Sequence, residues 1–278
     1  MEEQILRDTP TESELPKKKK GSCISRMAKV ILILFFIWWF NNYTLKINEK
    51  HISSDKVNND VKLAVLSDLH AYDGIFSIDN KTIVKKIKRI DPDAVCVLGD
   101  MHSSNADETE KQISMDLMTG IIDEGYKLYF VLGEHDDRTN AYVDKMEKNK
   151  IHVLDGEAEK ITIGDTDLTF YGISNAFFSP SFDLTNEFDI DKSTYNILLA
   201  HIPMYSDYEK FGADLTLCGD THGGIIQIPF LGPAYYNGKF VPELYEDKNK
   251  IFDKGLFKYD GGYLFCLLYT SPSPRDCS

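Results

Sequence analysis

The chain has few cysteines, and none of them has the spacing of a metal cluster. Its 278 residues include five cysteines, which are scattered without a C-x-x-C pair. This scatter argues against both a disulfide framework and a cysteine-based zinc site. Cys96 and Cys218 lie inside apolar runs, where a small buried side chain is the expected role.

Three further absences narrow the class of protein. The G-x-G-x-x-G and Walker signatures of nucleotide-binding folds are missing, and no internal repeat is present. Positive charge is also scarce, since 31 Lys and Arg stand against 44 Asp and Glu, for a formal net charge of −13. This balance argues against nonspecific binding to nucleic acid, and we expect no nucleic-acid partner. An acidic body of this kind suits bound cations.

A long apolar run occurs near the N-terminus, at Met27–Phe40, after the basic stretch PKKKK. The run alone spans roughly 20 Å, but counted on to Leu45 it approaches the ~30 Å hydrocarbon core of a membrane. A cleaved signal peptide would need a small-residue cleavage site, which does not follow Phe40, and a buried helix would normally have a polar face. We therefore predict a transmembrane signal anchor over residues 27–45.

The flanking charges set the expected orientation and the domain limits. Basic residues before the apolar run place residues 1–26, which are polar and expected to be disordered, in the cytoplasm. The protein would then be a single-pass protein of the cell membrane with an extracytoplasmic body. We predict a linker over 46–60, the folded domain over 61–266, and a non-native tail over 267–278. The tail, LLYTSPSPRDCS, resembles translated adaptor or vector sequence, so we expect the natural chain to continue differently beyond about residue 266.

The body alternates between predicted strands and helices in its first half. Apolar strand patterns at VKLAVLS, AVCVLG and KLYFVLG are separated by helical patterns over 78–90 and 108–124, and a short helix is predicted near 140–149. Later strands follow one another without such helices: KITIGDTDLTFYGI as a pair turning at Gly164, then YNILLAH, LTLCG and GIIQIP. This order indicates an α/β fold with a mixed sheet, or two sheets flanked by helices.

Acidic and histidine side chains follow one predicted strand after another. Loops at the carboxyl ends of strands form the binding crevice of open α/β sheets, so these side chains are expected to converge. So many carboxylates in one crevice would repel one another unless cations lay between them. A mixture of carboxylate and imidazole suits Mn, Fe or Zn, and two ions better than one. The residues are Asp68, His70, Asp100, His102, Glu134, His135, Asp136, Asp137, His201, Asp220 and His222.

The blocks DLH, GD, GEHD, AH and GDTHGG resemble, in order, the five blocks of the calcineurin-like metallophosphoesterases. The resemblance covers roughly residues 61–265 and is strongest to the membrane-anchored bacterial branch, whose last block precedes an apolar strand, here IIQIPFLGP. It implies a four-layer α/β/β/α sandwich with mixed sheets.

The resemblance also implies a role for each matching residue. Asp68, His70 and His222 would bind a first metal ion, and Asp100 would bridge two ions. His201 would bind the second ion. His135 would lie beside the leaving group as a hydrogen-bond donor or proton source, and a bridging water would attack the phosphorus atom. We give His102 a lesser prospect as a substrate contact. Asp136 and Asp137 would either orient His135 or be solvated loop residues, and we favour the second role.

Two positions depart from the family pattern, and both belong to the second metal site. Glu134 replaces the usual Asn, and Asp220 replaces the usual His. Two neutral ligands thus become anions, giving a second site of Asp100, Glu134, His201 and Asp220. Harder ligands favour Mn, Mg or Fe(II) over Zn, but the added charge also repels an anionic phosphate. The second site is therefore either tuned to a harder metal or weakened.

These features predict a metal-dependent hydrolase of phosphoric esters, with a monoester, diester or pyrophosphate bond as substrate. Two divalent ions are the expected cofactors, with Mn or Fe favoured and Zn or Mg compatible. The predicted anchor points to a lipid-linked or envelope-derived phosphate. The alternative is a catalytically silent metal-binding domain that recognises a ligand or a partner.

Overall fold

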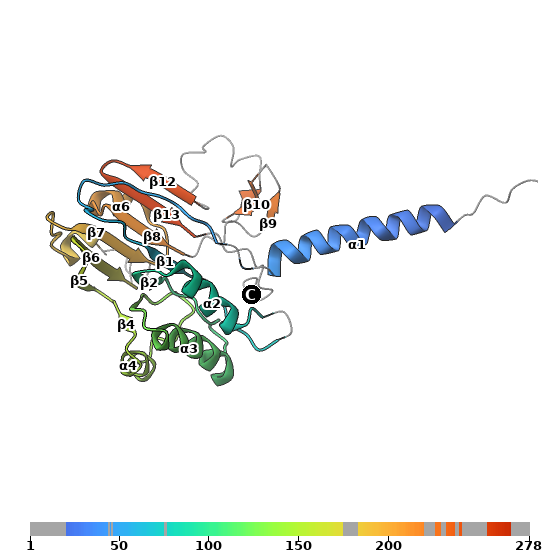
Figure 1. Ribbon diagram of the computed structural model, residues 1–278, viewed down its shortest axis with the longest axis horizontal. Helices are drawn as coiled ribbons and strands as arrows, with labels where there is room; N and C mark the ends of the chain where they lie inside the picture. Colours follow the sequence, from blue (N-terminus) through green and yellow to red (C-terminus); the bar gives the residue numbers. More distant parts are fainter. Residues whose placement is uncertain are drawn as a thin grey trace, which may run out of the picture. The chain divides into compact units, whose positions relative to one another are not determined.

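The computed structural model of the chain describes residues 21–43, 45, 47–74, 77–174, 183–219, 226–228, 232–236, 239–240 and 255–267. The chain separates into two compact units, Met1–Asn41 and Asn42–Ser278. Figure 1 shows the elements of both units along the chain. Among the described elements, the strands and helices α2 to α6 belong to the second unit, and most of α1 belongs to the first.

Helix α1 (Gly21–Tyr43) contains the apolar run found in the sequence. The side chains from Val30 to Ile37 are exposed within the chain. The described part of the chain contains no helix with both the length and the apolar character of a membrane span, so the anchor predicted over 27–45 is not found there. Side chains are described for residues 25–37 of this helix.

The first sheet of the body is parallel in the described residues, with the strand order β1-β2-β3-β4. Its strands are short and largely apolar, as expected of parallel strands that are covered on both faces. Their bounds are Leu63–Leu66 for β1, Ala94–Val97 for β2, Leu128–Phe130 for β3 and His152–Val153 for β4. The chain returns to this sheet through α2 (Asn80–Ile90), α3 (Glu108–Asp123) and α4 (Asn140–Lys148).

The second sheet is mixed and has the order β12-β13-β8-β7-β6-β5. Parallel pairs in its centre, β6–β7, β7–β8 and β8–β13, are flanked by antiparallel pairs at both edges. Its strands are β5 (Glu157–Ile163), β6 (Thr166–Ile173), β7 (Tyr195–Ala200), β8 (Leu215–Cys218), β12 (Gly255–Tyr259) and β13 (Gly262–Cys266). A small third sheet contains β9 (Ile226–Ile228), β10 (Gly232–Tyr236) and β11 (Lys239–Phe240).

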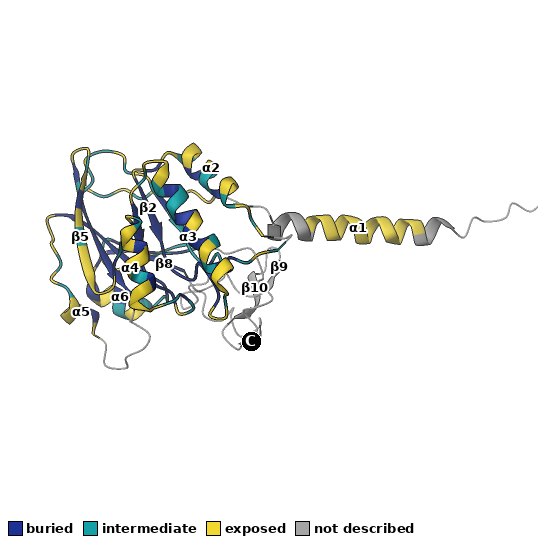
Figure 2. Cartoon of the chain, turned by 90° about the horizontal axis from the view of Figure 1, so that it is seen from below, coloured by how far each residue is buried: buried dark blue, intermediate teal, exposed yellow. Residues whose placement is uncertain are grey.

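Alternating side chains divide the body into four layers. In β2, Val95 and Val97 pack with α2, α3 and α4, whereas Ala94 and Cys96 face the other sheet. In β7, Ile197 and Leu199 meet that inter-sheet core. The opposite face of the mixed sheet packs against α5 (Leu184–Glu187) and α6 (Tyr205–Phe211). Figure 2 shows dark-blue strands inside and helices exposed on their outer faces. The predicted α/β/β/α order of layers is therefore confirmed within the described residues.

Residues 52–61, most of which fall within the predicted linker, pack along the body. Ile52, Val57 and Val61 contact the inter-sheet core. The backbone N–H groups of Asn58 and Asn59 both donate to Thr166 Oγ1. This segment is therefore held by both apolar burial and hydrogen bonds.

The helices with a clear helical spacing and the strands with a marked apolar run were predicted, and several elements without either pattern were not. The predicted helix over 78–90 is α2, in which Ile83 and Ile87 are buried. The hairpin predicted to turn at Gly164 is β5–β6. The sequence analysis missed β4, β10, β11, β12, α5 and α6, which lack the marked apolar runs that identified equally short strands such as β1, β2 and β3.

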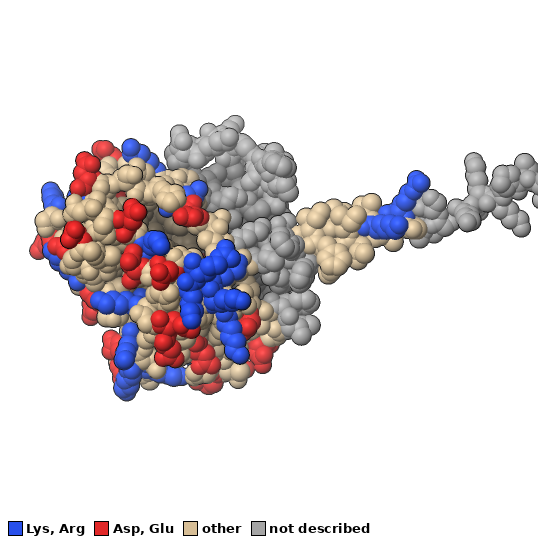
Figure 3. All heavy atoms as spheres, in the orientation of Figure 1, with Lys and Arg blue, Asp and Glu red and all other residues tan. Residues whose placement is uncertain are grey.

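The face shown in Figure 3 carries Lys and Arg side chains interspersed with Asp and Glu side chains.

Candidate metal centre

The candidate site lies where the strands of both sheets end. Asp68 and His70 follow β1, Asp100 follows β2, His135 follows β3, and His201 follows β7. Asp68, His70, Asp100 and His201 are all at most 3% exposed. Glu134 joins the same cluster beside His135, whereas the predicted ligands Asp220 and His222 lie outside the described residues. The structure therefore brings together six of the predicted site residues: Asp68, His70, Asp100, Glu134, His135 and His201.

Asp100 is at the centre of this cluster. Its Oδ2 atom lies 3.1 Å from Nε2 of His201, 3.8 Å from Nε2 of His135 and 3.9 Å from Nε2 of His70. Three imidazoles from different loops thus point at one carboxylate oxygen. In the described part of the chain, that buried oxygen accepts no hydrogen bond of good geometry.

Two overlapping groups of ligand atoms share Asp100. Asp68, His70 and Asp100 offer ligand atoms within 4.8 Å of one another, and so do Asp100, Glu134 and His135. His201 adjoins the first group, since its Nε2 lies 4.0 Å from Oδ1 of Asp68 and 3.1 Å from Oδ2 of Asp100. Asp100 is thus common to both groups, and it is the residue to which the family resemblance assigns a bridging role.

The orientation of His201 favours binding of a cation. Its Nδ1 is 2.6 Å from the carbonyl oxygen of Leu98, to which it can only donate. In the neutral ring the lone pair is then on Nε2, which faces the Asp100 carboxylate. A lone pair and a carboxylate face each other favourably only with a proton or cation between them. These donors fit a divalent metal ion of the Mn, Fe or Zn type.

The backbone at the site has an uncommon conformation. Asp68, His70 and Asp100 have φ of 54°, 43° and 51°, in the left-handed region. Non-glycine residues rarely adopt it, and such outliers cluster at functional sites. The loops are nevertheless hydrogen-bonded to one another, since Asp68 N donates to Gly99 O at 3.0 Å and His70 N to Asp100 O at 3.0 Å.

Two glycines allow the loops to come this close. A Cβ atom on Gly133 would lie 2.0 Å from Oδ1 of Asp100, and one on Gly219 would lie 2.0 Å from Oγ of Ser67. Neither distance is possible for real atoms. The glycines of the GEHD and GDTHGG blocks therefore leave room for the site residues of neighbouring loops.

His135 and Glu134 lie at the accessible edge of the cluster, each with 35% of its side chain exposed. Nε2 of His135 is 3.3 Å from Oε1 of Glu134. Its Nδ1 is 2.5 Å from the hydroxyl of Ser104, a residue that the sequence analysis did not identify. His135 is thus held by a hydroxyl on one side and faces carboxylates on the other.

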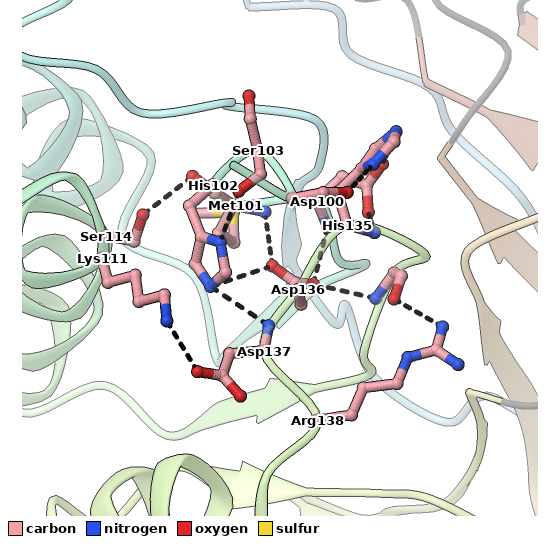
Figure 4. Close-up of polar contacts among 12 residues, drawn as sticks. Asp100, Met101, His102, Ser103, Lys111, Ser114, His135, Asp136, Asp137 and Arg138 are labelled. Carbon is pink, nitrogen blue, oxygen red and sulfur yellow. Dashed lines mark hydrogen bonds and ion pairs between the residues drawn. The ribbon is translucent and has the colours of Figure 1, made fainter. Parts of the chain in front are cut away.

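Asp136 and His102 differ from their predictions. Asp136 is only 5% exposed, so it is not a solvated loop residue. Its carboxylate accepts hydrogen bonds from three backbone N–H groups, as Figure 4 shows. His102, given a lesser prospect as a substrate contact, is buried and accepts a hydrogen bond from Asp137 N at its Nε2 atom. Asp137 pairs with Lys111 at 2.8 Å.

The pKa of Asp100 reflects its surroundings. Burial alone would raise it, but the imidazole of His201 and the backbone N–H of His135 outweigh that effect and lower the pKa to about 2. Asp100 is therefore ionised at neutral pH, as a metal ligand must be. For Asp136, burial and the nearby charge of Asp100 raise the pKa.

The sequence model of the calcineurin-like phosphoesterase family matches residues 61–224. The chain belongs to this family. It is 25% identical over 243 residues to an uncharacterised metallophosphoesterase of Campylobacter jejuni, covering 82% of this chain and 63% of that protein. It is 26% identical over 241 residues to one of Helicobacter pylori, covering 81% and 64%. The chain thus spans slightly under two thirds of the length of both relatives.

Among solved structures, the NAD nucleotidase of Haemophilus influenzae matches with a TM-score of 0.48 and 16% identity. The match covers 77% of this chain and 45% of that protein.

Proposed function

We propose that this protein hydrolyses phosphoric esters with two divalent metal ions bound around Asp100. The observation that carries the proposal is the convergence of three imidazole Nε2 atoms on Asp100 Oδ2, within 3.1 to 3.9 Å. Family membership supports the same reaction class.

The family resemblance suggests how the ligands divide between the two ions. Asp68 and His70 would bind the first ion, Glu134 and His201 the second, and Asp100 both. His222 and Asp220 are proposed to complete the two sets, on the basis of the sequence alone. Divalent ions in these positions would neutralise the phosphoryl oxygens and lower the pKa of a water nucleophile towards neutrality.

The chain's own residues account for the other requirements of the reaction. His135 is exposed enough to contact a substrate, and Ser104 holds its Nδ1. Its Nε2 faces the carboxylates of Glu134 and Asp100 at 3.3 and 3.8 Å, and a proton carried there could pass to the leaving oxygen. Asp68, His70 and His201 are buried, so they close the inner side of the site to bulk water.

A silent metal-binding domain is the second candidate, and one contact favours it. Glu134 Oε1 lies 3.3 Å from Nε2 of His135, the residue proposed to meet the leaving group. An anion there repels an anionic substrate unless a cation binds between them.

Hydrolysis of bis(p-nitrophenyl) phosphate with added Mn²⁺, together with the metal content of the purified protein, separates the two functions. A hydrolase should contain close to two ions per chain and lose turnover in Asp100→Ala and His135→Ala. Metal binding without turnover would favour the silent domain. Turnover that both variants retain would come from a contaminant.

We also propose the identity of the metal, the location of the protein and the class of its substrate. The carboxylate-rich ligand set supports Mn²⁺ or Fe²⁺. The apolar side chains exposed along α1 and the basic residues before them support attachment to the cell membrane, with the body on the extracytoplasmic side. A lipid-linked or envelope-derived phosphate would be consistent with that location. Membrane fractionation, with protease protection of intact cells, tests the location and orientation.

A further inference from the structure

Asp136, in the loop after β3, connects that loop to the loop after β2, which carries the central ligand Asp100. Its Oδ2 atom accepts from Asp100 N at 2.7 Å and from Gly133 N at 2.8 Å, and its Oδ1 accepts from Met101 N at 2.9 Å. The first and third of these donors follow β2, and the second follows β3. One buried carboxylate therefore fixes both loops at the point where they touch (Figure 4).

Asp136 fixes the left-handed backbone conformation of Asp100. Asp100 has a φ of 51°, and its own N–H is one of the three donors. An N–H group that points at a fixed carboxylate restricts the rotation of its peptide. The hydrogen bonds from Asp100 and Met101 thus hold the left-handed turn from both of its adjacent peptides.

The same loop also fixes the Asp100 side chain. The backbone N–H of His135 donates to Asp100 Oδ1 at 2.9 Å, which leaves Oδ2 directed at the three imidazoles. Because His135 and Asp136 are neighbours, the loop after β3 holds the main chain of Asp100 with one residue and its carboxylate with the next.

We propose that Asp136 is a positioning residue of the metal centre, which orients the Asp100 carboxylate by holding its backbone. It binds no metal ion and touches no substrate. The proposal rests on the metal site put forward above, but its first measurement is metal affinity, which does not depend on turnover.

The test compares Asp136→Asn with Asp137→Asn in the full chain. Both remove one charge from adjacent positions, but the Asp137 side chain pairs with Lys111 and lies outside the contacts around Asp100. An Asn at 136 keeps the shape and replaces one acceptor by an N–H₂ group, which faces backbone donors. We expect Asp136→Asn to lower the affinity for Mn²⁺ by about 10- to 100-fold, the range for residues that orient metal ligands. Asp137→Asn should bind Mn²⁺ like the natural chain.

Titration of Mn²⁺ by calorimetry gives both affinities, and thermal unfolding in chelator shows whether each variant folds. Equal affinity in Asp136→Asn and the natural chain would overturn the proposal, as would an equal loss in both variants. If Mn²⁺ affinity falls only in Asp136→Asn and the natural chain shows no turnover, the hydrolase function fails and the positioning role stands.

Amide exchange of the natural chain provides a test that does not depend on a variant that folds. In chelator, the N–H groups of Asp100, Met101 and Gly133 should exchange at least about tenfold more slowly than open-loop amides, because Asp136 accepts from all three. Exchange at open-loop rates would overturn the proposal.

Discussion

Nε2 of His201 lies 3.1 Å from Oδ2 of Asp100, while the other nitrogen of the same ring contacts the carbonyl oxygen of Leu98 at 2.6 Å. The two residues come from different sheets, since His201 follows β7 and Asp100 follows β2. The contact therefore depends on how the two sheets stack, and it brings together one proposed metal ligand from each sheet. Metal binding should accordingly stabilise the whole body.

The natural chain should unfold at a higher temperature with Mn²⁺ than with chelator. An ion present at 100 times its dissociation constant adds about 2.7 kcal/mol to the free energy of unfolding. For a body of this size, that corresponds to a rise of roughly 5–10 °C in the unfolding midpoint. Differential scanning calorimetry measures it. Mg²⁺ and Zn²⁺ in separate scans rank the metals, and an identical midpoint in all conditions would contradict metal binding.

Asp100→Asn should remove this response. The amide keeps the shape of the side chain but loses the charge that two ions would share, so Mn²⁺ affinity should fall at least about 100-fold. The midpoint in chelator should fall, because a carboxyl group whose pKa is lowered to about 2 in the folded state stabilises that state at neutral pH and the amide does not. Calorimetry with and without Mn²⁺ tests both points. A variant that keeps the full metal-induced shift would show that Asp100 is not the shared ligand.

Sequence patterns located this site because its ligands follow strands. Asp68, Asp100 and His135 each come directly after an apolar run, and parallel strands bring such positions to one edge. The pattern could not distinguish proposed metal ligands from residues that hold those ligands in position. Asp136 and Asp137 are adjacent acids in the same loop, yet one is buried under three N–H groups and the other pairs with Lys111. That difference depends on the path of the loop after β2.

Ser104 could not be found from the sequence for a similar reason. Its contact with His135 joins positions 31 residues apart, and a serine in a polar loop carries no pattern. The fold was more accessible, because alternation along β2 and β7 already divides their side chains between two layers.

Ser104→Ala should slow turnover without removing the metal. The hydroxyl makes a hydrogen bond to Nδ1 of His135, and such a bond contributes about 1 kcal/mol, or roughly fivefold in kcat. Ser104 is exposed, so the unfolding midpoint should stay nearly the same. Steady-state kinetics with bis(p-nitrophenyl) phosphate, beside metal analysis, test this. Ser104→Thr keeps a hydroxyl and is the matched control. A loss of metal in Ser104→Ala would show a different role.

Glu134→Asn should move the metal preference towards Zn²⁺. It replaces an anionic ligand by the neutral one usual in the family, so the ratio of Mn²⁺ to Zn²⁺ affinity should fall by roughly tenfold. It also removes the carboxylate 3.3 Å from His135 Nε2. Competition titrations give the ratio, and Glu134→Gln separates the effect of charge from that of length. An unchanged ratio in both variants would mean that Glu134 does not bind the metal.

The pair formed by Asp137 and Lys111 should stabilise the fold in a pH-dependent way. The hydrogen bond from Lys111 lowers the pKa of Asp137 from its usual 3.8 to about 2. A carboxyl group whose pKa is lower in the folded state stabilises it fully above the unfolded pKa, and this contribution is lost as pH falls through the folded pKa. At pH 7, Asp137→Asn should therefore lower the free energy of unfolding by about 1 kcal/mol, a value reduced for solvent screening.

Between about pH 4 and pH 2 the difference between the two proteins should shrink towards zero. Urea unfolding in chelator at pH 7, 4 and 3 measures it. A difference that stays constant over this range would assign the effect to packing around Lys111 rather than to the charge of Asp137.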